Sequence, residues 1–358
     1  MVGPQVAVCG VVKADAYGHG AIPIARALIA AGIDHLAVAS FDEAVELRHA
    51  SITAPILIFG GVRGARASEA ARLGLAVTVW SAVQVHQLAA ALAPGQTLAV
   101  HVKLDTGMHR IGAQQRELAA LVEALRAGPF TIAGVMSHFA CADEPGHGSV
   151  GAQLDAFTGA LGVLAGLGVA PPLRHLANSA GALAEPRARF DMVRVGLLLY
   201  GCAPSPGLAA DLDLQPVMHL RSRIAQLKTI PPGDHVGYGW TFTARRETRL
   251  GVLLAGYAFG YPRALSNRGE VLVRGRRAPV VGTISMDHVT IDVTDVPDAA
   301  EGDVVTLWGS DGAEKVDVME LGARAGTIGY ELLTCVSQRT PRSYLSSTST
   351  TAGRIVPA

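Results

Sequence analysis

From the first residue to about residue 205, short apolar runs alternate with longer segments in which apolar residues recur every three or four positions. The first kind of run indicates a strand, and the second, as over residues 22–33 and 117–128, indicates a helix. The strands expected on this basis cover residues 6–12, 35–40, 55–60, 75–80, 98–104, 131–137, 171–176 and 192–197. Because these runs are apolar almost throughout, both faces of their sheet should be covered, as in parallel sheets. The pattern predicts an α/β fold whose residues 1–210 form a (β/α)8 TIM-like barrel, with an open doubly wound sheet as the alternative.

After Pro216 the pattern changes, because alternating or β-branched runs separated by turn residues replace the helical periodicity. These runs predict strands over residues 223–230, 249–256, 270–275, 279–285, 288–294 and 303–308. Residues 216–342 are therefore expected to form a mainly β C-terminal domain. The Ser- and Thr-rich residues 343–358 are expected to be a flexible tail. The uncharged segment 156–173 contains glycines and a proline pair, so we interpret it as a buried helix that runs into a strand, not as a membrane span.

Charge and cysteine content narrow the class of partner. Lys plus Arg and Asp plus Glu both total 30, so no net field would attract nucleic acid or an anionic membrane. A small-molecule partner is the better expectation. The four cysteines are scattered without metal-ligand spacing, which favours reduced thiols in the cytoplasm. The first twenty residues show no export signal, and no set of histidines is assigned as metal ligands.

Polar residues occur where the predicted barrel strands end, which is where barrel enzymes carry their chemistry. Lys13, Lys103 and His138 stand where the first, fifth and sixth strands end. A lysine at the end of an apolar strand can have a depressed pKa and form a Schiff base, although a lysine that extends to the surface fits the position equally well. After the last two strands, Ser179 and the amides of Gly196 and Leu197 could hold a phosphate.

The segment VVKADAYGHG at residues 11–20 closely resembles the cofactor-lysine signature of alanine racemases. The resemblance continues in the family's order through KLDTGMHRIG, SHFACADEP, HLANSAGAL, MVRVGLLLYG, GYAFGYPR, VGTISMDH and IGYELLTCVSQRTPR, and it covers nearly the whole chain. It implies a fold-type III enzyme that uses pyridoxal 5'-phosphate, with a barrel followed by a β domain. The activity implied is the interconversion of L-alanine and D-alanine, which supplies D-alanine for peptidoglycan.

The resemblance assigns two bases on opposite faces of the substrate. Lys13 matches the lysine that holds the cofactor and moves the α-proton on the D-side, and Tyr257 matches the tyrosine that acts on the L-side. Outside this motif, Tyr257 would more often be a packed aromatic side chain. Arg194 matches the arginine that bonds the pyridine nitrogen, which makes the cofactor a weaker electron sink and suppresses side reactions. A structural arginine paired with an acid is the alternative for Arg194.

Further positions match ligand-binding residues of the family. Arg110 would lie near the cofactor's phenolic oxygen and the substrate carboxylate, and Lys103 matches a position that is often carbamylated and then orients Arg110. The backbone of Met286 would contact the substrate carboxylate. The cofactor phosphate would be held by Tyr17, Ser179, Tyr330 and the amides of Gly196 and Leu197, while His138 and His175 would orient Tyr257 and Arg194 or would simply be satisfied core histidines.

Tyr257 and Met286 would extend into the barrel of a second subunit, so the resemblance implies a homodimer with shared active sites. Three other functions stay open. A broad-specificity racemase would need only a larger pocket. A decarboxylase or D-threonine aldolase of the same fold type is disfavoured by the pairing of Arg194 with Tyr257. A non-catalytic pyridoxal-phosphate-binding protein typically ends after the barrel, so the β domain argues against it.

Two features depart from the family pattern. The family usually has a strand and a helix before the first barrel strand, where here only residues 1–5 stand, so we expect an exposed sheet edge and an uncovered barrel flank. In addition, Phe259 occupies a position in GYAFG that is usually Asp. An apolar ring beside Tyr257 could alter the loop, the access channel or the pKa of the tyrosine.

Overall fold

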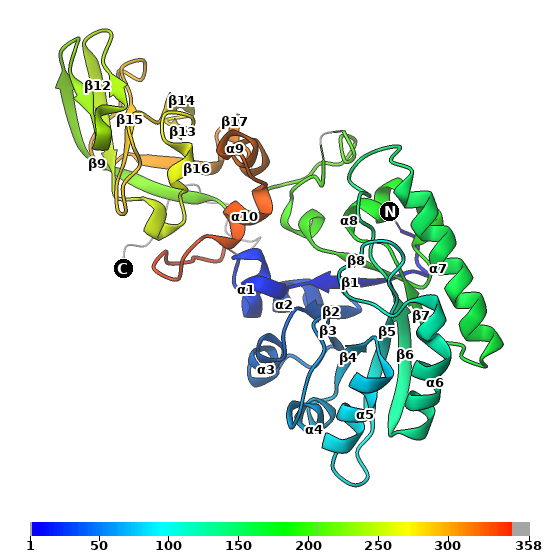
Figure 1. Ribbon diagram of the computed structural model, residues 1–358. Helices are drawn as coiled ribbons and strands as arrows, with labels where there is room; N and C mark the ends of the chain where they lie inside the picture. Colours follow the sequence, from blue (N-terminus) through cyan, green and yellow to red (C-terminus); the bar gives the residue numbers. More distant parts are fainter. Residues whose placement is uncertain (1, 206, 346–358) are drawn as a thin grey trace.

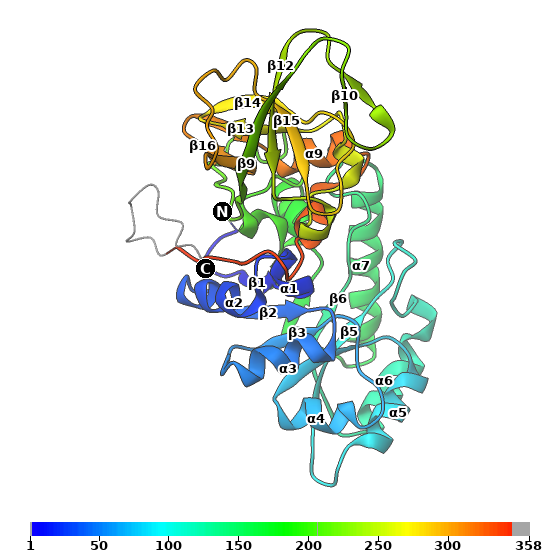
Figure 2. The same ribbon diagram turned by 90° about the vertical axis from the view of Figure 1, so that its left-hand side faces the viewer.

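A computed structural model describes residues 2–205 and 207–345 (Figures 1 and 2). All eight predicted strands of the first half are confirmed, as β1 (Ala7–Val11), β2 (His35–Val38), β3 (Ile56–Ile58), β4 (Leu75–Val79), β5 (Leu98–Lys103), β6 (Phe130–Met136), β7 (Leu173–His175) and β8 (Met192–Val195). They pair in parallel in the order β7-β6-β5-β4-β3-β2-β1-β8.

The sheet closes on itself between β7 and β8. Asp191 N–H donates to Arg174 O and Arg194 N–H donates to Ala177 O, each over 3.0 Å. Because β8 also pairs with β1, the eight strands form a ring, and the fold is the predicted TIM-like barrel. The alternative of an open doubly wound sheet is thereby excluded.

Helices surround the strands, as Figure 1 shows. They are α2 (Ala21–Ala30), α3 (Phe41–His49), α4 (Arg66–Arg72), α5 (Ala82–Ala91), α6 (Leu118–Ala127), α7 (Ser149–Gly166) and α8 (Ser179–Ala184). The two helices predicted from periodicity are α2 and α6, and the segment 156–173 is indeed the end of a helix followed by a strand. Within the described part of the chain, no helix combines the length and apolarity that a membrane crossing needs.

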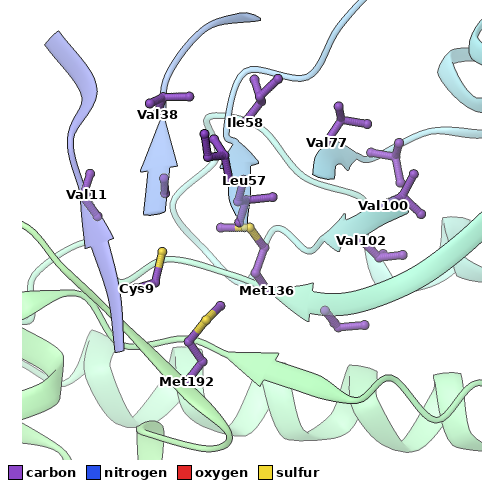
Figure 3. Packing of buried hydrophobic residues seen from close by; sticks show 14 of the residues in the cluster. Cys9, Val11, Val38, Leu57, Ile58, Val77, Val100, Val102, Met136 and Met192 are labelled. Carbon is purple, nitrogen blue, oxygen red and sulfur yellow. The ribbon is translucent and has the colours of Figure 1, made fainter. Parts of the chain in front are cut away.

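Apolar side chains from separate strands fill the barrel interior. Figure 3 shows Cys9, Leu57, Met136 and Met192, from β1, β3, β6 and β8, pointing toward one another. All four are buried. The near-continuous hydrophobicity of the strands is explained by this arrangement, because one side of each strand packs inside the barrel and the other packs against the helices.

The second half is an antiparallel sheet with strand order β14-β13-β16-β9-β12-β15. Its strands are β9 (Leu220–Ile230), β12 (Thr248–Leu253), β13 (Glu270–Val273), β14 (Arg276–Pro279), β15 (Val289–Asp292) and β16 (Val304–Asp311), to which β17 (Glu314–Val316) adds at β16, and β10 (His235–Val236) pairs with β11 (Phe242–Thr243). Two helices follow, α9 (Val318–Ala325) and α10 (Gly329–Thr334). The prediction of a mainly β second half is confirmed, whereas the end of the predicted tail, residues 346–358, lies outside the described residues.

One predicted strand is wrong. Residues 279–285 contribute only the end of β14 and a single bridge between Val280 and Ile291. The chain turns away at Gly282, whose φ of +76° favours glycine and whose added Cβ would lie 2.7 Å from Val236 O. This turn carries the following residues, up to Met286, away from the sheet as a loop.

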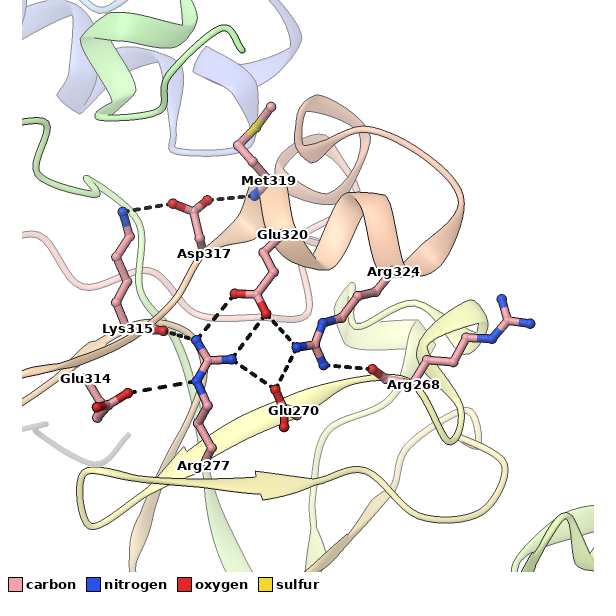
Figure 4. A network of polar contacts seen from close by, with 9 residues as sticks. All are labelled: Arg268, Glu270, Arg277, Glu314, Lys315, Asp317, Met319, Glu320 and Arg324. Atoms are coloured by element: carbon pink, nitrogen blue, oxygen red, sulfur yellow. Dashed lines mark hydrogen bonds and ion pairs between the residues drawn. The ribbon is translucent and has the colours of Figure 1, made fainter. Parts of the chain in front are cut away.

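A network of ion pairs fixes α9 to the β13–β14 hairpin, as Figure 4 shows. Arg277 pairs with Glu270 over 3.0 Å and with Glu320 over 3.2 Å, and Arg324 pairs with the same two carboxylates over 2.8 and 2.6 Å. The next helix, α10, contacts the turn that follows β1. The β domain is thereby attached to the mouth of its own barrel.

Candidate active site

Lys13 stands directly after β1, at the start of a turn (α1, Lys13–Tyr17) with an unusual backbone. Ala14, Asp15, Ala16 and Tyr17 all have φ between +52° and +54°, in the left-handed region. Such a conformation costs roughly 1–2 kcal/mol for each non-glycine residue. Hydrogen bonds offset this cost, because Ala14 N–H donates to the Glu43 carboxylate over 2.6 Å and Ala21 N–H donates to the Asp15 carboxylate over 2.7 Å. Backbone strain of this kind gathers at functional sites.

The turn is further fixed by α10 of the β domain. Gly18 has a φ of +77°, and a Cβ on it would lie 2.1 Å from Leu333 O, so only glycine allows this approach. Arg342 Nε donates to Gly18 O over 2.8 Å. Contacts from both halves of the chain therefore set the position of the turn that begins with Lys13.

Cationic side chains gather around Lys13. Burial and the charge of Arg110 lower the pKa of Lys13, and the Glu43 carboxylate only partly opposes the shift. Burial lowers the pKa of Lys103 to about 7, with the charges of Arg194 and Arg110 acting in the same direction. Arg110 itself is exposed on the loop after β5. A barrel mouth with this charge favours an anionic ligand.

Arg194 is a buried cation held by neutral acceptors. Its Nη1 donates to His175 Nδ1 over 3.0 Å and to His175 O over 2.9 Å. Its Nη2 has three acceptors, Ser137 O at 2.6 Å, Leu176 O at 3.0 Å and His138 Nδ1 at 3.1 Å. No carboxylate within the described ranges accepts from this guanidinium, so the alternative of a structural ion pair is wrong. Burial lowers the pKa of Arg194 to about 10, which leaves it charged at neutral pH.

His138 and His175 are neutral parts of this arrangement. Burial, with the nearby Arg194 charge, lowers the pKa of both imidazoles well below the usual value. A neutral ring nitrogen can accept a hydrogen bond from arginine, whereas a protonated ring cannot. Both histidines thus serve as acceptors that orient Arg194.

Hydroxyl groups and backbone amides meet after β7 and β8. Gly196 N–H donates to Ser179 Oγ over 2.9 Å, and a Cβ on Gly196 would lie 2.5 Å from Tyr17 Oη. Leu197 begins the 3-10 helix η3 (Leu197–Tyr200), so its N–H is among the helix donors without an intrahelical partner. The ring of Tyr330 on α10 lies 6.0 Å from that of Tyr17, centroid to centroid. Burial raises the pKa of Tyr330 to about 12, so its hydroxyl stays a donor.

These groups fit pyridoxal phosphate. The hydroxyls and amides around Gly196 are donors for a phosphate, and the small volume of glycine lets the ligand approach the backbone. Arg194 Nε–H has no protein acceptor within the described parts of the chain, so it is free to donate to a ring nitrogen. Lys13 has a lowered pKa and stands at the same end of the barrel.

Tyr257 and Met286 are brought together on two adjacent loops of the β domain. Tyr257 begins the 3-10 helix η5 (Tyr257–Phe259), and its N–H donates to Ser285 O over 3.2 Å. Gly256 allows the two loops to touch, because a Cβ there would lie 2.4 Å from Met286 O. The Tyr257 and Met286 side chains are 43% and 53% exposed. They face solvent in the single chain and are available to another surface.

Two residues of the site escaped the sequence prediction. Glu43 supports the Lys13 turn through Ala14 N–H, and its only signal is the capping box in which Ser40 Oγ accepts from Glu43 N–H over 3.3 Å. His101 contacts His175 with 2.8 Å between His101 Nδ1 and His175 Nε2. His101 precedes Lys103 by two positions on β5, and this spacing places both side chains on the same face of the strand.

The fold and the site define an α/β-barrel enzyme with an anion-binding mouth and an attached β domain. The family model "Alanine racemase, N-terminal domain" matches residues 1–204, and "Alanine racemase, C-terminal domain" matches residues 217–344. The chain therefore belongs to the alanine racemase family, and the protein is a racemase, an enzyme of the isomerase class.

Individual relatives are similar to this chain over most of their length. The alanine racemase of Halothermothrix orenii is 42% identical over 348 residues, which cover 96% of this chain and 91% of the relative. That of Syntrophobacter fumaroxidans is 44% identical over 343 residues, or 95% and 91% of the two chains. Among solved structures, the alanine racemase of D-cycloserine-producing Streptomyces lavendulae has a TM-score of 0.92 at 41% identity, covering 96% of this chain and 92% of that chain. The Bacillus anthracis enzyme, solved with bound L-Ala-P, has a TM-score of 0.91 at 35% identity, covering 96% and 90%.

Proposed function

We propose that this protein interconverts L-alanine and D-alanine with pyridoxal 5'-phosphate held at Lys13. Its place in the alanine racemase family supports the substrate. The observation that carries the proposal is the position of Lys13 at the end of β1, with a pKa lowered by burial and by the charge of Arg110. A lysine of this kind is the group that cofactor attachment requires.

Binding of the cofactor is assigned to groups of the barrel and of α10. Tyr17, Ser179, Tyr330 and the amides of Gly196 and Leu197 hold its phosphate. Arg194 would donate to its ring nitrogen, and His138 and His175 hold the guanidinium through hydrogen bonds to its Nη atoms. When bound, pyridoxal phosphate withdraws electrons from the substrate α-carbon and makes the α-proton acidic. Because an arginine does not readily surrender a proton to the ring nitrogen, this withdrawal is moderate and side reactions are limited.

Proton transfer is assigned to two side chains on opposite faces of the substrate. Lys13 Nζ removes or returns the α-proton on the D-side, and the phenol of Tyr257, supplied by a second subunit, does so on the L-side. Arg110 and the backbone of Met286 hold the substrate carboxylate. Lys103, with a pKa of about 7, has a neutral fraction at physiological pH that can be carbamylated, and the resulting anion would orient Arg110.

A homodimer completes the site in this proposal. Tyr238 and Trp240, on the hairpin between β10 and β11, are 75% and 69% exposed, and Thr283 Oγ1 donates to Tyr238 O over 2.8 Å. Thr283 precedes Met286 by three residues, so this hairpin contacts the loop that carries Met286. Exposed aromatic groups in such a cluster indicate an interface. Residues 1–210 and 216–342 would act as the cofactor domain and the partner-completing domain of a cytoplasmic enzyme that supplies D-alanine for peptidoglycan.

Deuterium exchange tests the reaction and its specificity. The protein loaded with pyridoxal phosphate is incubated with L-alanine, L-serine or L-lysine in deuterated water, and the products are separated by chiral chromatography. We expect α-deuterated D-alanine and little product from the other two. Comparable turnover of serine or lysine would instead indicate a broad-specificity racemase. Absence of exchange with every substrate, despite bound cofactor, would indicate a non-catalytic carrier and overturn the proposal.

A further inference from the structure

We propose that His101 is a positioning residue that keeps His175 in the form able to accept a hydrogen bond from Arg194. The three side chains form a buried chain, with 2.8 Å between His101 Nδ1 and His175 Nε2 and 3.0 Å between His175 Nδ1 and Arg194 Nη1. The consequence for cofactor chemistry rests on the proposed function. The geometric part of the proposal does not, because it concerns only side chains of this protein.

The positions of the ring hydrogens on His175 and His101 follow from the fact that Arg194 can only donate. Arginine has no acceptor atom, so His175 Nδ1 must present its lone pair to Arg194. A neutral His175 then carries its hydrogen on Nε2, which points at His101 Nδ1. His101 Nδ1 must therefore accept, and His101 carries its own hydrogen on Nε2. One direction of hydrogen bonding runs from Arg194 through His175 to His101.

Two local features of strands β5 and β6 make room for the His101 ring. A Cβ on Gly134 of β6 would lie 2.4 Å from His101 Nδ1, so a larger residue there would push the ring away. The pairing of β5 with β6 shifts register between Val100 and His101. The small residue at Gly134 and the register shift together allow the His101 ring to contact His175.

Removal of the His101 acceptor should therefore disturb Arg194. His175 is fully buried, and His101 is the partner of its Nε2–H within the described residues. Without that partner, the ring can rotate or move its hydrogen to Nδ1, and either change removes one of the two acceptors of Arg194 Nη1 and leaves His175 O. The guanidinium then keeps hydrogen bonds only to backbone carbonyl groups and to His138. Its Nε–H would no longer be held toward the ring nitrogen.

Nitrogen NMR of the histidine rings in the cofactor-free protein tests the geometric part. We expect His175 to carry hydrogen on Nε2 in the natural sequence and in His101→Asn, whose amide oxygen can accept where Nδ1 did. In His101→Leu we expect this Nε2–H signal to shift or to disappear through exchange with water. The exposed His86 on α5 provides the matched change, because His86→Leu should leave the His175 signal unchanged. Finding hydrogen on Nδ1 of His175 in the natural sequence would overturn the proposal without any variant.

The loaded enzyme tests the functional part. We expect His101→Leu to lower kcat by about tenfold or more with little change in KM, and His101→Asn to recover most of the loss. The cofactor absorption band should move in His101→Leu but not in His86→Leu. Equal kcat and equal spectra in all four proteins would overturn the role of His101. Failure of the natural protein to take up pyridoxal phosphate would instead contradict the proposed function and leave the NMR result to decide this inference.

Discussion

Arg339 lies over the ring of Phe259, with 4.6 Å between its Cζ and the ring centroid. The same guanidinium pairs with Asp287, with 3.3 Å between Nη1 and Oδ1. Phe259 follows Tyr257 by two residues, and Asp287 follows Met286 directly. One arginine therefore connects the two loops that carry the proposed substrate-facing groups of the β domain. The Phe259 ring contacts this cation through its face.

We predict that Arg339→Ala lowers kcat/KM severalfold, because a cation–π contact of ~0.5–1 kcal/mol and a surface ion pair both hold the Tyr257 loop. Phe259→Asp should lose less activity than Phe259→Ala, since an aspartate can still pair with Arg339. Arg66 offers a control with the same two kinds of contact, as it lies over Phe41 at 5.2 Å and pairs with Asp42 at 3.1 Å, and neither partner belongs to the Tyr257 or Met286 loop. If steady-state kinetics give the same kcat/KM for Arg66→Ala and Arg339→Ala, Arg339 does not act by connecting the Tyr257 and Met286 loops.

Complementation between two inactive variants tests the shared site. In a mixed dimer of Lys13→Ala and Tyr257→Phe chains, one site contains both changes and the other contains neither. Random mixing should therefore restore about a quarter of the natural activity, since half of the dimers are mixed and each has one intact site of two. Activity is measured after the two proteins are unfolded and refolded together. No recovery, despite mixed dimers confirmed by mass spectrometry, would mean that Lys13 and Tyr257 act within one chain.

Carbamylation of Lys103 is expected because burial lowers the pKa of its amine to about 7. At pH 8 most of this amine is neutral and can react with carbon dioxide. We predict a carbamate carbon signal when the protein is incubated with ¹³C-bicarbonate at this pH. The signal should be absent from Lys103→Arg and retained in a variant of an exposed lysine such as Lys228→Arg. A spectrum without a protein-bound carbamate would remove the proposed means of orienting Arg110.

Acid should destabilise the barrel before its carboxylates titrate. Burial lowers the pKa of His101 to about 3, and burial with the Arg194 charge keeps the pKa of His138 and His175 well below 6.5. Between pH 6.5 and these lower values the unfolded chain binds more protons, so the free energy of unfolding falls as the pH falls. Each such histidine contributes up to ~1.4 kcal/mol per pH unit. Urea unfolding at pH 7.5, 6 and 5 measures the slope, which His101→Asn should reduce by about one histidine's share. An unchanged slope in that variant would contradict a neutral, buried His101.

The fold could be predicted because its signals are local. Most barrel strands are short, predominantly apolar runs, and helices connect them. The strand predicted over residues 279–285 failed because Gly282 adopts a positive φ set by the nearby Val236 carbonyl, a contact from more than forty positions away. Hydrophobic pattern alone cannot report such a contact.

The site was predictable only where residues follow strands or match a motif. Lys13, Lys103, Ser179 and Gly196 are found at the strand ends, as barrel geometry requires. His101 was missed because a polar residue inside a strand carries no local sign of its partner. The left-handed turn after Lys13 was not expected either, since no glycine occurs among residues 14–17 and the hydrogen bond from Ala14 to Glu43 is formed between distant positions.

The central claim is that the amine of Lys13 holds pyridoxal phosphate. Reduction of the loaded protein with borohydride, followed by proteolysis and mass mapping, measures this directly, with Lys103→Arg as a control that retains Lys13. The account predicts a single phosphopyridoxyl group on the peptide that contains Lys13, in both proteins. A label on Lys103 or on another peptide, or no label at all, would contradict it.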